Sequence, residues 1–508
     1  MNPLKPSVPP HRTFGEIAGF LGAAARGESN VLITGLAVAT SSVRPGDLFV
    51  AVRGANAHGA AYVPAALRAG AVAVLTDDAG ATMIDPGIPY LVVPDPRGRL
   101  GPLSAWFYDR PADDLTLVGI TGTTGKTTVA WLVDAAMRQA WSRSAVLGTL
   151  AVGFDGVPVA SPRTTLEAPD LQAALAAMRE AGIKGCAMEV SSHALALGRV
   201  DGLVLDVAVL TNLARDHLDF HRSVDAYHAV KASLFQPDRA RHGVVWVGDQ
   251  PAAQMKPGIP TVRVGWDETA DWRAERRGTV MIDGEPAQGF ALTGPVSVEA
   301  ATRLVGEFNL VNAATGLAAA IVAGIDPDVA AAGISALKCV PGRMEPVRGP
   351  DPAPLTVVDF AHTPAAINAV LHALRARTAG RLIVVLGAGG GRDRGKRAEM
   401  GAAAAGQADV VIVTDDNPRD EDPAAIRRAV LAGVGSGSGA GPGAHVAVQE
   451  VPDRAEAIAA ALDQAQLGDT VAVLGKGHET GQVVGDRTID FDDRAVLAEA
   501  LKEHGPWT

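Results

Sequence analysis

The chain has 508 residues, enough for about three domains, and its 47% hydrophobic content with 57 glycines and 33 prolines is typical of α/β domains joined by many turns. Its formal net charge of −11 argues against a general binder of nucleic acid or anionic membranes, so an anionic substrate would need local arginine, lysine or metal. The two cysteines exclude a disulfide framework and a cysteine-rich zinc site.

The N-terminal stretch, residues 1–14, contains several prolines and lacks the apolar core of a signal peptide. No run of about 20 uninterrupted apolar residues occurs in the chain. We therefore expect a soluble, cytoplasmic protein without membrane insertion.

The first segment predicts a small α/β domain over residues 1–110. A strand is expected in "PGDLFVAV" (45–52), followed by a helix and a second strand within "YVPAALRAGAVAVLTDD" (62–78). The polar, proline-containing stretch "YDRPADDL" (108–115) marks the boundary to the next domain.

The remaining chain predicts a central domain over residues 111–345 and a C-terminal domain over residues 346–508, separated by the proline-rich stretch 340–354. The last segment alternates helices with apolar strands within residues 354–362, 381–391, 408–418, 444–451 and 469–479. This βαβ series predicts a parallel, doubly wound sheet. Polar residues cluster where these strands end, which is the edge at which open parallel sheets bind ligands.

A phosphate-binding turn is predicted where the strand "LTLVGIT" (115–121) enters a helix. Gly122, Gly125, Lys126 and Thr127 form a G-x-x-G-K-T pattern, in which glycines let backbone N–H groups approach phosphate and the lysine neutralises its charge. Ile120 replaces the first glycine of the full pattern. A plain glycine-rich turn is the alternative interpretation.

Two further clusters supply possible metal ligands. Glu189 directly follows an apolar run, and His217 lies in "TNLARDHLDFH" (211–221). Carboxylate oxygen and imidazole nitrogen both coordinate Mg²⁺ or Mn²⁺ in suitable settings. Taken alone, a solvated strand end and a locally hydrogen-bonded helix start explain these clusters as well.

Together, the motifs resemble those of the Mur ligases. They are "GITGTTGKTT", "EVSSHAL", "TNLARDHLDFH", "YHAVKASLF", "GEFNLVNAATG", "VPGRMEPV", "DFAHTP", "GGRDRGKR", "TDDNPR" and "GKGHE", in unbroken order from about Thr40 to Glu479. The resemblance implies an α/β fold with an N-terminal domain that binds UDP, a central P-loop ATPase domain with a mostly parallel sheet, and a C-terminal Rossmann-like domain that presents an amino acid.

The implied reaction is ATP-dependent amide ligation, with two Mg²⁺ sites. The side-chain carboxylate of D-Glu in UDP-N-acetylmuramoyl-L-alanyl-D-glutamate becomes an acyl phosphate, which an amine of meso-diaminopimelate attacks. Phosphorylation supplies a leaving group that a free carboxylate lacks, and a closed site must keep water away. We expect these small molecules to be its only partners, and a monomer.

The resemblance also assigns residues. Catalysis falls to Lys126, Lys231, Glu189 and His217. ATP binding falls to Gly122, Thr123, Thr124, Gly125, Lys126, Thr127, Thr128, Asn309, Asn312, Arg343, Asp359 and His362. The UDP-muramoyl dipeptide falls to Thr40, Ala55, Asn56, Ala57, Thr164, Thr165, Ser191 and Arg199. Diaminopimelate falls to Arg392, Asp416, Asn417, Pro418, Arg419, Gly475 and Glu479. The metal ligands are Thr127, Glu189, His217 and Lys231, the last as a carbamate formed by carbon dioxide.

Some positions depart from the family pattern. Ala39-Thr40-Ser41 replaces D-S-R, Leu166 follows Thr164-Thr165 in place of proline, and Phe360 replaces a tyrosine. Alternatives that share the ATP chemistry are the same ligation with L-lysine or another diamino acid, a D-glutamate-adding ligase and a folylpolyglutamate-type ligase. A nucleotide-binding regulator without turnover is the non-enzymatic alternative.

Overall fold

The computed structural model describes residues 4–54, 57–150, 152–154, 163–391, 393–435, 446–504 and 507. The chain divides into two compact units. Unit 1 comprises Met1–Arg277, Phe290–Ala301 and Asn312–Ala336, and unit 2 comprises Gly278–Gly289, Thr302–Val311 and Leu337–Thr508. Unit 1 thus contains the first predicted domain and most of the second, whereas residues 278–289, 302–311 and 337–345 of the second lie in unit 2. The boundaries at residues 110 and 345 stay predictions.

The N-terminal part of unit 1 contains a parallel sheet of four strands in the order β3-β4-β5-β6, namely Gly35–Ala37, Asp47–Val50, Ala73–Thr76 and Tyr90–Val92. Helix α2 (Val63–Arg68) connects β4 to β5. These elements confirm the predicted strand, helix and strand. The strands are mostly apolar because α1 (Phe14–Leu21) and α4 (Pro96–Phe107) contribute to the core on one face, and α2 to that on the other.

The central sheet has ten strands in the order β16-β15-β14-β13-β12-β11-β7-β10-β8-β9. Strand β7 (Thr116–Thr121) lies between β11 (Leu205–Leu210) and β10 (Gly185–Glu189), and it runs parallel to both. Beyond β11 follow β12 (Ala240–Trp246) and β13 (Thr261–Gly265), also parallel. The carboxyl ends of β7, β10 and β11 therefore meet at one edge of the sheet.

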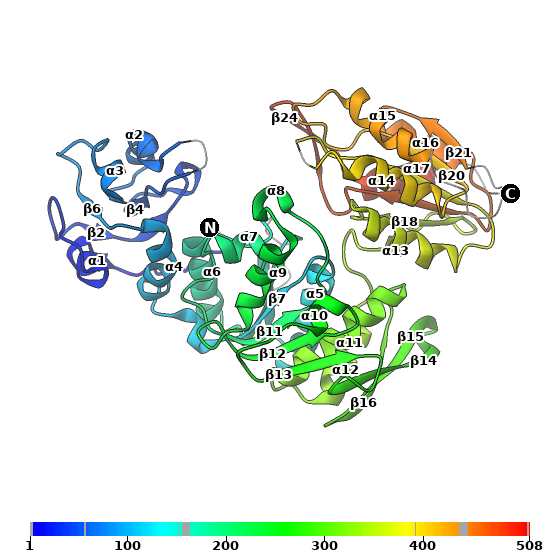
Figure 1. Ribbon diagram of the computed structural model, residues 1–508, viewed down its shortest axis with the longest axis horizontal. Coiled ribbons are helices and arrows are strands. Elements are labelled where there is room, and N and C mark those ends of the chain that lie inside the picture. The colour runs from blue at the N-terminus through cyan, green and yellow to red at the C-terminus, as the bar shows by residue number, and fades with distance from the viewer. Residues whose placement is uncertain are drawn as a thin grey trace. The chain divides into compact units, whose positions relative to one another are not determined.

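The outer strands of this sheet are β14 (Trp272–Ile282), β15 (Glu285–Thr293) and β16 (Ser297–Thr302) on one side, and β8 (Ser144–Leu147) and β9 (Val152–Phe154) on the other. Helix α5 (Lys126–Trp141) packs against β7, β8 and β10, and α12 (Pro327–Ala336) packs on α5. Helix α6 (Ala168–Glu180) contacts α4, which joins the N-terminal sheet to this core. Figure 1 shows the course of these elements along the chain.

Unit 2 is built on a sheet in the order β17-β18-β22-β19-β20-β21. Its parallel strands are β18 (Leu355–Asp359), β19 (Leu382–Leu386), β20 (Val410–Val413), β21 (Ala447–Glu450) and β22 (Thr470–Leu474), and the antiparallel edge strand is β17 (Glu345–Pro346). The five predicted strands are thus confirmed.

Helices cover both faces of this sheet, as a doubly wound fold requires. One apolar cluster against the sheet includes residues of α13 (Pro364–Arg375), α14 (Lys396–Ala405) and α15 (Pro423–Val434). A second apolar cluster includes residues of α16 (Arg454–Asp463) and α17 (Asp493–Glu503). In the described part of the chain, every helix is too short or too polar to cross a membrane.

Candidate active site

The predicted phosphate turn connects β7 to α5, as expected. Gly122 has φ +144°, and a side chain there would meet the Thr211 hydroxyl at 1.9 Å. Gly125 has φ +82°, and a Cβ there would meet Asn312 Oδ1 at 2.6 Å. Both positions therefore require glycine. Helix α5 begins at Lys126, directly after this turn, so the positive end of the helix dipole lies at the turn and favours an anion there.

Lys126 lies over this turn. Its Nζ donates hydrogen bonds to the carbonyl oxygens of Gly122, at 2.9 Å, and Thr123, at 3.0 Å. Asn212 also holds the turn, because its Oδ1 accepts from the Thr124 N–H at 3.0 Å. The turn therefore has a defined backbone conformation and a cation at its mouth, which is the arrangement that phosphate binding needs.

Glu189 ends β10 and is only 2% exposed. Its Oε1 accepts hydrogen bonds from the Thr127 hydroxyl at 3.0 Å and from the Thr149 N–H at 2.7 Å. The Thr149 hydroxyl also donates to Oε2 at 3.3 Å. A side chain at Gly148 would approach Oε1 to 2.3 Å, so Gly148 permits this close packing. Sequence analysis missed Thr149, since it lies forty positions from its partner.

Lys231, in α9 (Val224–Ala232), is 1% exposed and reaches the same turn. Its Nζ donates to the Gly122 carbonyl at 2.8 Å and lies 4.7 Å from the centre of the Tyr227 ring. Burial, with the nearby Lys126 ammonium, lowers the pKa of Lys231 well below its usual value, against a smaller opposing effect of Asp216. The structure thus places a lysine with a readily neutralised amine beside the phosphate turn.

His217 lies in a left-handed backbone conformation, φ +52°, before α8 (Leu218–His221). Its ring centre lies 4.8 Å from that of His193, and its Nε2 lies 3.5 Å from Asp216 Oδ2. Burial lowers the pKa of His217, against the opposing Asp216 carboxylate. The neutral imidazole is the form that coordinates metal.

The predicted metal ligands are only partly brought together. Within the described ranges, no group of three or more histidine, cysteine, aspartate or glutamate side chains is arranged to hold a metal ion. Thr127 and Glu189 do lie in contact, and their hydroxyl and carboxylate are the hard oxygen donors that Mg²⁺ prefers. The chemistry of this pair therefore fits the ion, and the buried Glu189 carboxylate supplies its charge.

Several residues predicted to bind the UDP-muramoyl dipeptide surround the end of β10. The Thr165 hydroxyl donates to the Glu189 carbonyl at 2.9 Å and accepts from the Ser191 N–H at 3.1 Å. Thr164 Oγ1 lies 3.1 Å from Thr149 Oγ1. Thr164, Thr165 and Ser191 are thus continuous with the hydrogen bonds of Glu189.

Arg199 is buried and is held by Glu167, with Nε 2.9 Å from Oε1. Glu167 also pairs with Arg97 of α4 at 2.8 Å and with Arg163 at 3.2 Å. Desolvation lowers the pKa of Arg199, while Glu167 opposes this shift. Sequence analysis missed Glu167, which joins the N-terminal helix α4 to the predicted substrate arginine.

The predicted uridine contacts lie in loops that follow neighbouring parallel strands. Thr40 is in the short turn Thr40–Ser42 after β3, and Ala57 is in the loop after β4. Ala55 and Asn56 lie outside the described residues. In the same loop, His58 Nε2 lies 3.0 Å from Asp77 Oδ1, which ties the loop to the end of β5.

In unit 2, the predicted diaminopimelate residues follow the ends of β20 and β22. Asn417 Nδ2 donates to Glu479 Oε2 at 2.8 Å. Arg419, with φ +52°, donates to the Gly390 carbonyl at 2.6 Å. Gly475 has φ +114°, and a side chain there would meet Asp416 Oδ2 at 3.0 Å. Asp416, Asn417, Pro418, Arg419, Gly475 and Glu479 are therefore gathered as expected, whereas Arg392 lies outside the described residues.

The remaining residues predicted to bind ATP are divided between the two units. The Asn312 side chain lies beside Gly125 in unit 1. In unit 2, Asn309 donates to the Val305 carbonyl at 2.8 Å. The Arg343 guanidinium lies 4.5 Å from the centre of the Phe360 ring. Asp359 accepts from the N–H groups of Met344 and Ala361, both at 2.7 Å, and burial raises its pKa. His362 Nδ1 contacts the Phe360 carbonyl oxygen.

The strand–glycine turn–helix unit, with a lysine at its mouth and a threonine paired to a buried glutamate, defines the class of P-loop α/β proteins. Residues 32–107 match the model of the Mur ligase family, catalytic domain, residues 120–320 that of the Mur ligase middle domain, and residues 342–477 that of the Mur ligase, glutamate ligase domain. The chain belongs to the Mur ligase family.

Individual relatives are similar to this chain over nearly all of its length. The UDP-N-acetylmuramoyl-L-alanyl-D-glutamate–2,6-diaminopimelate ligase of Streptomyces avermitilis is 45% identical, over 99% of this chain and 98% of the relative. A solved structure of a ligase with the same name is 32% identical, with a TM-score of 0.65 over 97% of this chain and 99% of that one. The MurF ligase of Thermotoga maritima in complex with ADP shares the fold, at 19% identity and a TM-score of 0.60 over 92% of this chain and 95% of that one.

Proposed function

We propose that this chain is an ATP-dependent ligase that joins meso-diaminopimelate to the D-Glu side-chain carboxylate of UDP-N-acetylmuramoyl-L-alanyl-D-glutamate, in cytoplasmic peptidoglycan precursor synthesis. The observation that carries the proposal is the 45% identity to a ligase of that name over 99% of this chain. The site geometry supports it, because a phosphate turn, a buried carboxylate and a buried lysine meet at the end of β7.

The phosphate turn accounts for the need for ATP. A carboxylate resists attack by an amine because its oxygen is a poor leaving group, and transfer of the γ-phosphoryl group to that oxygen removes the obstacle. In this proposal, the N–H groups at the start of α5 and the Lys126 ammonium hold the phosphates. The amine of the amino acid then attacks the acyl carbon, and inorganic phosphate leaves.

Thr127 and Glu189 would hold Mg²⁺, and His217 is a further predicted ligand. When bound, the ion would offset the negative charge that builds up on the transferring phosphoryl group. The Thr149 N–H and hydroxyl fix the Glu189 carboxylate, so its orientation does not depend on the ion.

Lys231 is proposed to carry a carbamate. Carbon dioxide adds only to the neutral amine, forming a nitrogen–carbon bond as one proton leaves, and burial favours that neutral form. The carbamate exchanges a cation for an anion that would serve as an additional metal ligand near Gly122, whose carbonyl now accepts from Nζ at 2.8 Å.

The amino acid is proposed to bind in unit 2, where Arg419 and Glu479 supply opposite charges near the ends of two strands. A guanidinium suits the distal carboxylate that distinguishes diaminopimelate from lysine, and a carboxylate suits an ammonium. We also propose that the enzyme acts as a monomer.

The test is phosphate release from ATP in the presence of the UDP-muramoyl dipeptide and one amino acid at a time. We expect turnover with meso-diaminopimelate and little with L,L-diaminopimelate or L-lysine. Equal turnover with lysine would overturn the amino-acid assignment alone. Turnover with folate or with D-glutamate in place of these substrates would overturn the proposed function.

A further inference from the structure

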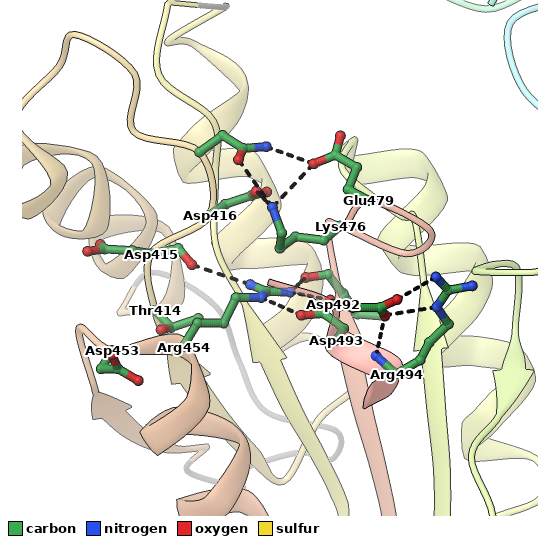
Figure 2. A network of polar contacts seen from close by, with 12 residues as sticks. Thr414, Asp415, Asp416, Asp453, Arg454, Lys476, Glu479, Asp492, Asp493 and Arg494 are labelled. Atoms are coloured by element: carbon green, nitrogen blue, oxygen red, sulfur yellow. Dashed lines mark hydrogen bonds and ion pairs between the residues drawn. The ribbon is translucent and has the colours of Figure 1, made fainter. Parts of the chain in front are cut away.

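Lys476 is a fully buried lysine between the two loops that carry the proposed amino-acid site. It follows β22, and its side chain has 0% exposure. Its Nζ donates hydrogen bonds to Asn417 Oδ1 at 3.1 Å and to the Gly481 carbonyl at 2.6 Å. It also lies 3.3 Å from Glu479 Oε2 and 3.6 Å from Asp416 Oδ1 (Figure 2).

These contacts fix the orientation of the side chains that face the amino acid. The Asn417 amide is held at both ends, since its Oδ1 accepts from Lys476 while its Nδ2 donates to Glu479 Oε2 at 2.8 Å. Asn417 Oδ1 accepts as well from the Val483 N–H at 2.9 Å. Lys476 thus determines which way the amide points and keeps one oxygen of Glu479 in place.

The charges around Lys476 also favour a cation at this position. Asp416 is 6% exposed, and its Oδ1 accepts no hydrogen bond among the described residues. Both carboxylates lie near the same nitrogen, at 3.6 and 3.3 Å, and without that cation their negative charges would repel each other. Lys476 offsets one negative charge, so that Asp416 and Glu479 together keep about one negative charge for an incoming ammonium.

A second buried cation, Arg454, holds the backbone from which these two loops start. Arg454, at the start of α16, and Asp493 both have 0% exposed side chains, and they pair through two hydrogen bonds of 2.7 and 2.8 Å. Arg454 also donates to the carbonyls of Leu474, at 3.0 Å, and Asp415, at 3.5 Å, which lie at the ends of β22 and β20 (Figure 2). The backbones that carry Lys476 and Asp416 are therefore fixed independently of Lys476.

We infer that Lys476 is a positioning residue for amino-acid specificity, which acts by holding Asn417 and Glu479 in the orientation that receives the amino acid's ammonium group and by limiting the negative charge there. The inference rests on the proposed function. It concerns unit 2 alone and leaves the phosphate chemistry of unit 1 unchanged.

The experiment compares Lys476→Met with Lys502→Met, in the full chain with all three substrates. Lys502 is an exposed lysine of α17 in the same unit and serves as the matched control. For Lys476→Met we expect the KM for meso-diaminopimelate to rise about tenfold or more, with the KM values for ATP and the UDP-muramoyl dipeptide within about twofold of wild type. Lys502→Met should match wild type in all three.

A double-mutant cycle with Glu479→Gln separates positioning from simple loss of structure. If Lys476 acts through Glu479, the two substitutions together should raise the KM for diaminopimelate by clearly less than the product of their single effects. Because KM is a property of the folded molecules and does not depend on their number, partial misfolding would lower the apparent kcat and leave KM unchanged. Lys476→Gln, which keeps a hydrogen-bond donor, is the second variant.

An unchanged KM for diaminopimelate, an equal rise in all three KM values, or multiplicative effects in the cycle would overturn the inference. Failure of both Lys476 variants to fold, judged by circular dichroism, would also overturn it, since the lysine would then be a folding residue. Absence of wild-type turnover with diaminopimelate would instead count against the proposed function, and the wild-type assay is therefore run first.

Discussion

The Thr127 hydroxyl donates a 3.0 Å hydrogen bond to Oε1 of Glu189, a residue 62 positions away. The contact joins the start of α5 to the end of β10 and places a buried carboxylate at the mouth of the phosphate turn. The Thr149 N–H, at 2.7 Å, holds the same oxygen. We therefore place the proposed phosphate and metal chemistry at this pair of residues.

Glu189→Gln should raise the Mg²⁺ concentration needed for half-maximal activity by roughly ten- to a hundredfold, because an amide offers a neutral oxygen in place of a charged one. The measurement is kcat against Mg²⁺ concentration, with exposed Glu268→Gln as the control. An unchanged Mg²⁺ dependence would remove Glu189 from the metal site.

Lys231→Ala should lose nearly all activity and recover part of it with short-chain carboxylic acids, which replace the carbamate anion. Exposed Lys184→Ala is the control. A mutant with full activity, or mass spectra of the native protein that never show the added mass of carbon dioxide, would contradict the carbamate.

The lowered pKa of Lys231 also predicts a dependence on pH and carbon dioxide. As the pH falls through that lowered pKa, the amine becomes protonated and carbamate formation stops, so activity in buffer depleted of carbon dioxide should fall most at acidic pH. Added bicarbonate should restore activity at neutral pH more fully than at acidic pH. Activity that is indifferent to bicarbonate at every pH would argue for an unmodified lysine.

Glu167→Gln should raise the KM for the UDP-muramoyl dipeptide by about tenfold while sparing the KM for diaminopimelate. The reason is that Glu167 holds Arg199 at 2.9 Å and also pairs with Arg97 and Arg163, so its loss leaves a cluster of mutually repelling arginines. Steady-state kinetics with each substrate varied in turn provides the check. A uniform loss of kcat with unchanged KM would point to a purely structural role.

Arg419→Ala should lower kcat/KM for meso-diaminopimelate by roughly ten- to a hundredfold, which corresponds to the loss of about 1.5–3 kcal/mol from a charge-assisted contact. The KM for ATP should stay nearly constant. Exposed Arg428→Ala, on α15, is the matched control. If the Arg419 variant keeps its preference for diaminopimelate over lysine, another residue must recognise the distal carboxylate.

The features that depend on neighbouring residues in the sequence were predicted well. Strands such as Thr116–Thr121 and Leu382–Leu386 are continuous apolar runs because both faces of their sheets are covered, and such runs are recognisable without a structure. The phosphate turn was predictable for the same reason, since its glycines, lysine and threonine are consecutive. The residues of the amino-acid site were predictable only through the resemblance to a family.

The supporting residues could not be predicted because their partners are distant in the chain. Glu167 meets Arg97 across 70 positions, and Arg454 meets Asp493 across 39. A lone glutamate or arginine carries no local pattern that indicates burial or pairing. Of the four metal ligands that the resemblance names, Thr127 and Glu189 are in contact, and the metal-binding roles of all four stay predictions.

The most direct test of the central claim is the mass of the product formed from UDP-N-acetylmuramoyl-L-alanyl-D-glutamate, meso-diaminopimelate and ATP. We expect a UDP-muramoyl tripeptide, heavier than the dipeptide by one diaminopimelate less one water, with one ADP and one phosphate released per product. Absence of that mass while ATP is hydrolysed, or its formation without ATP, would overturn the proposed function.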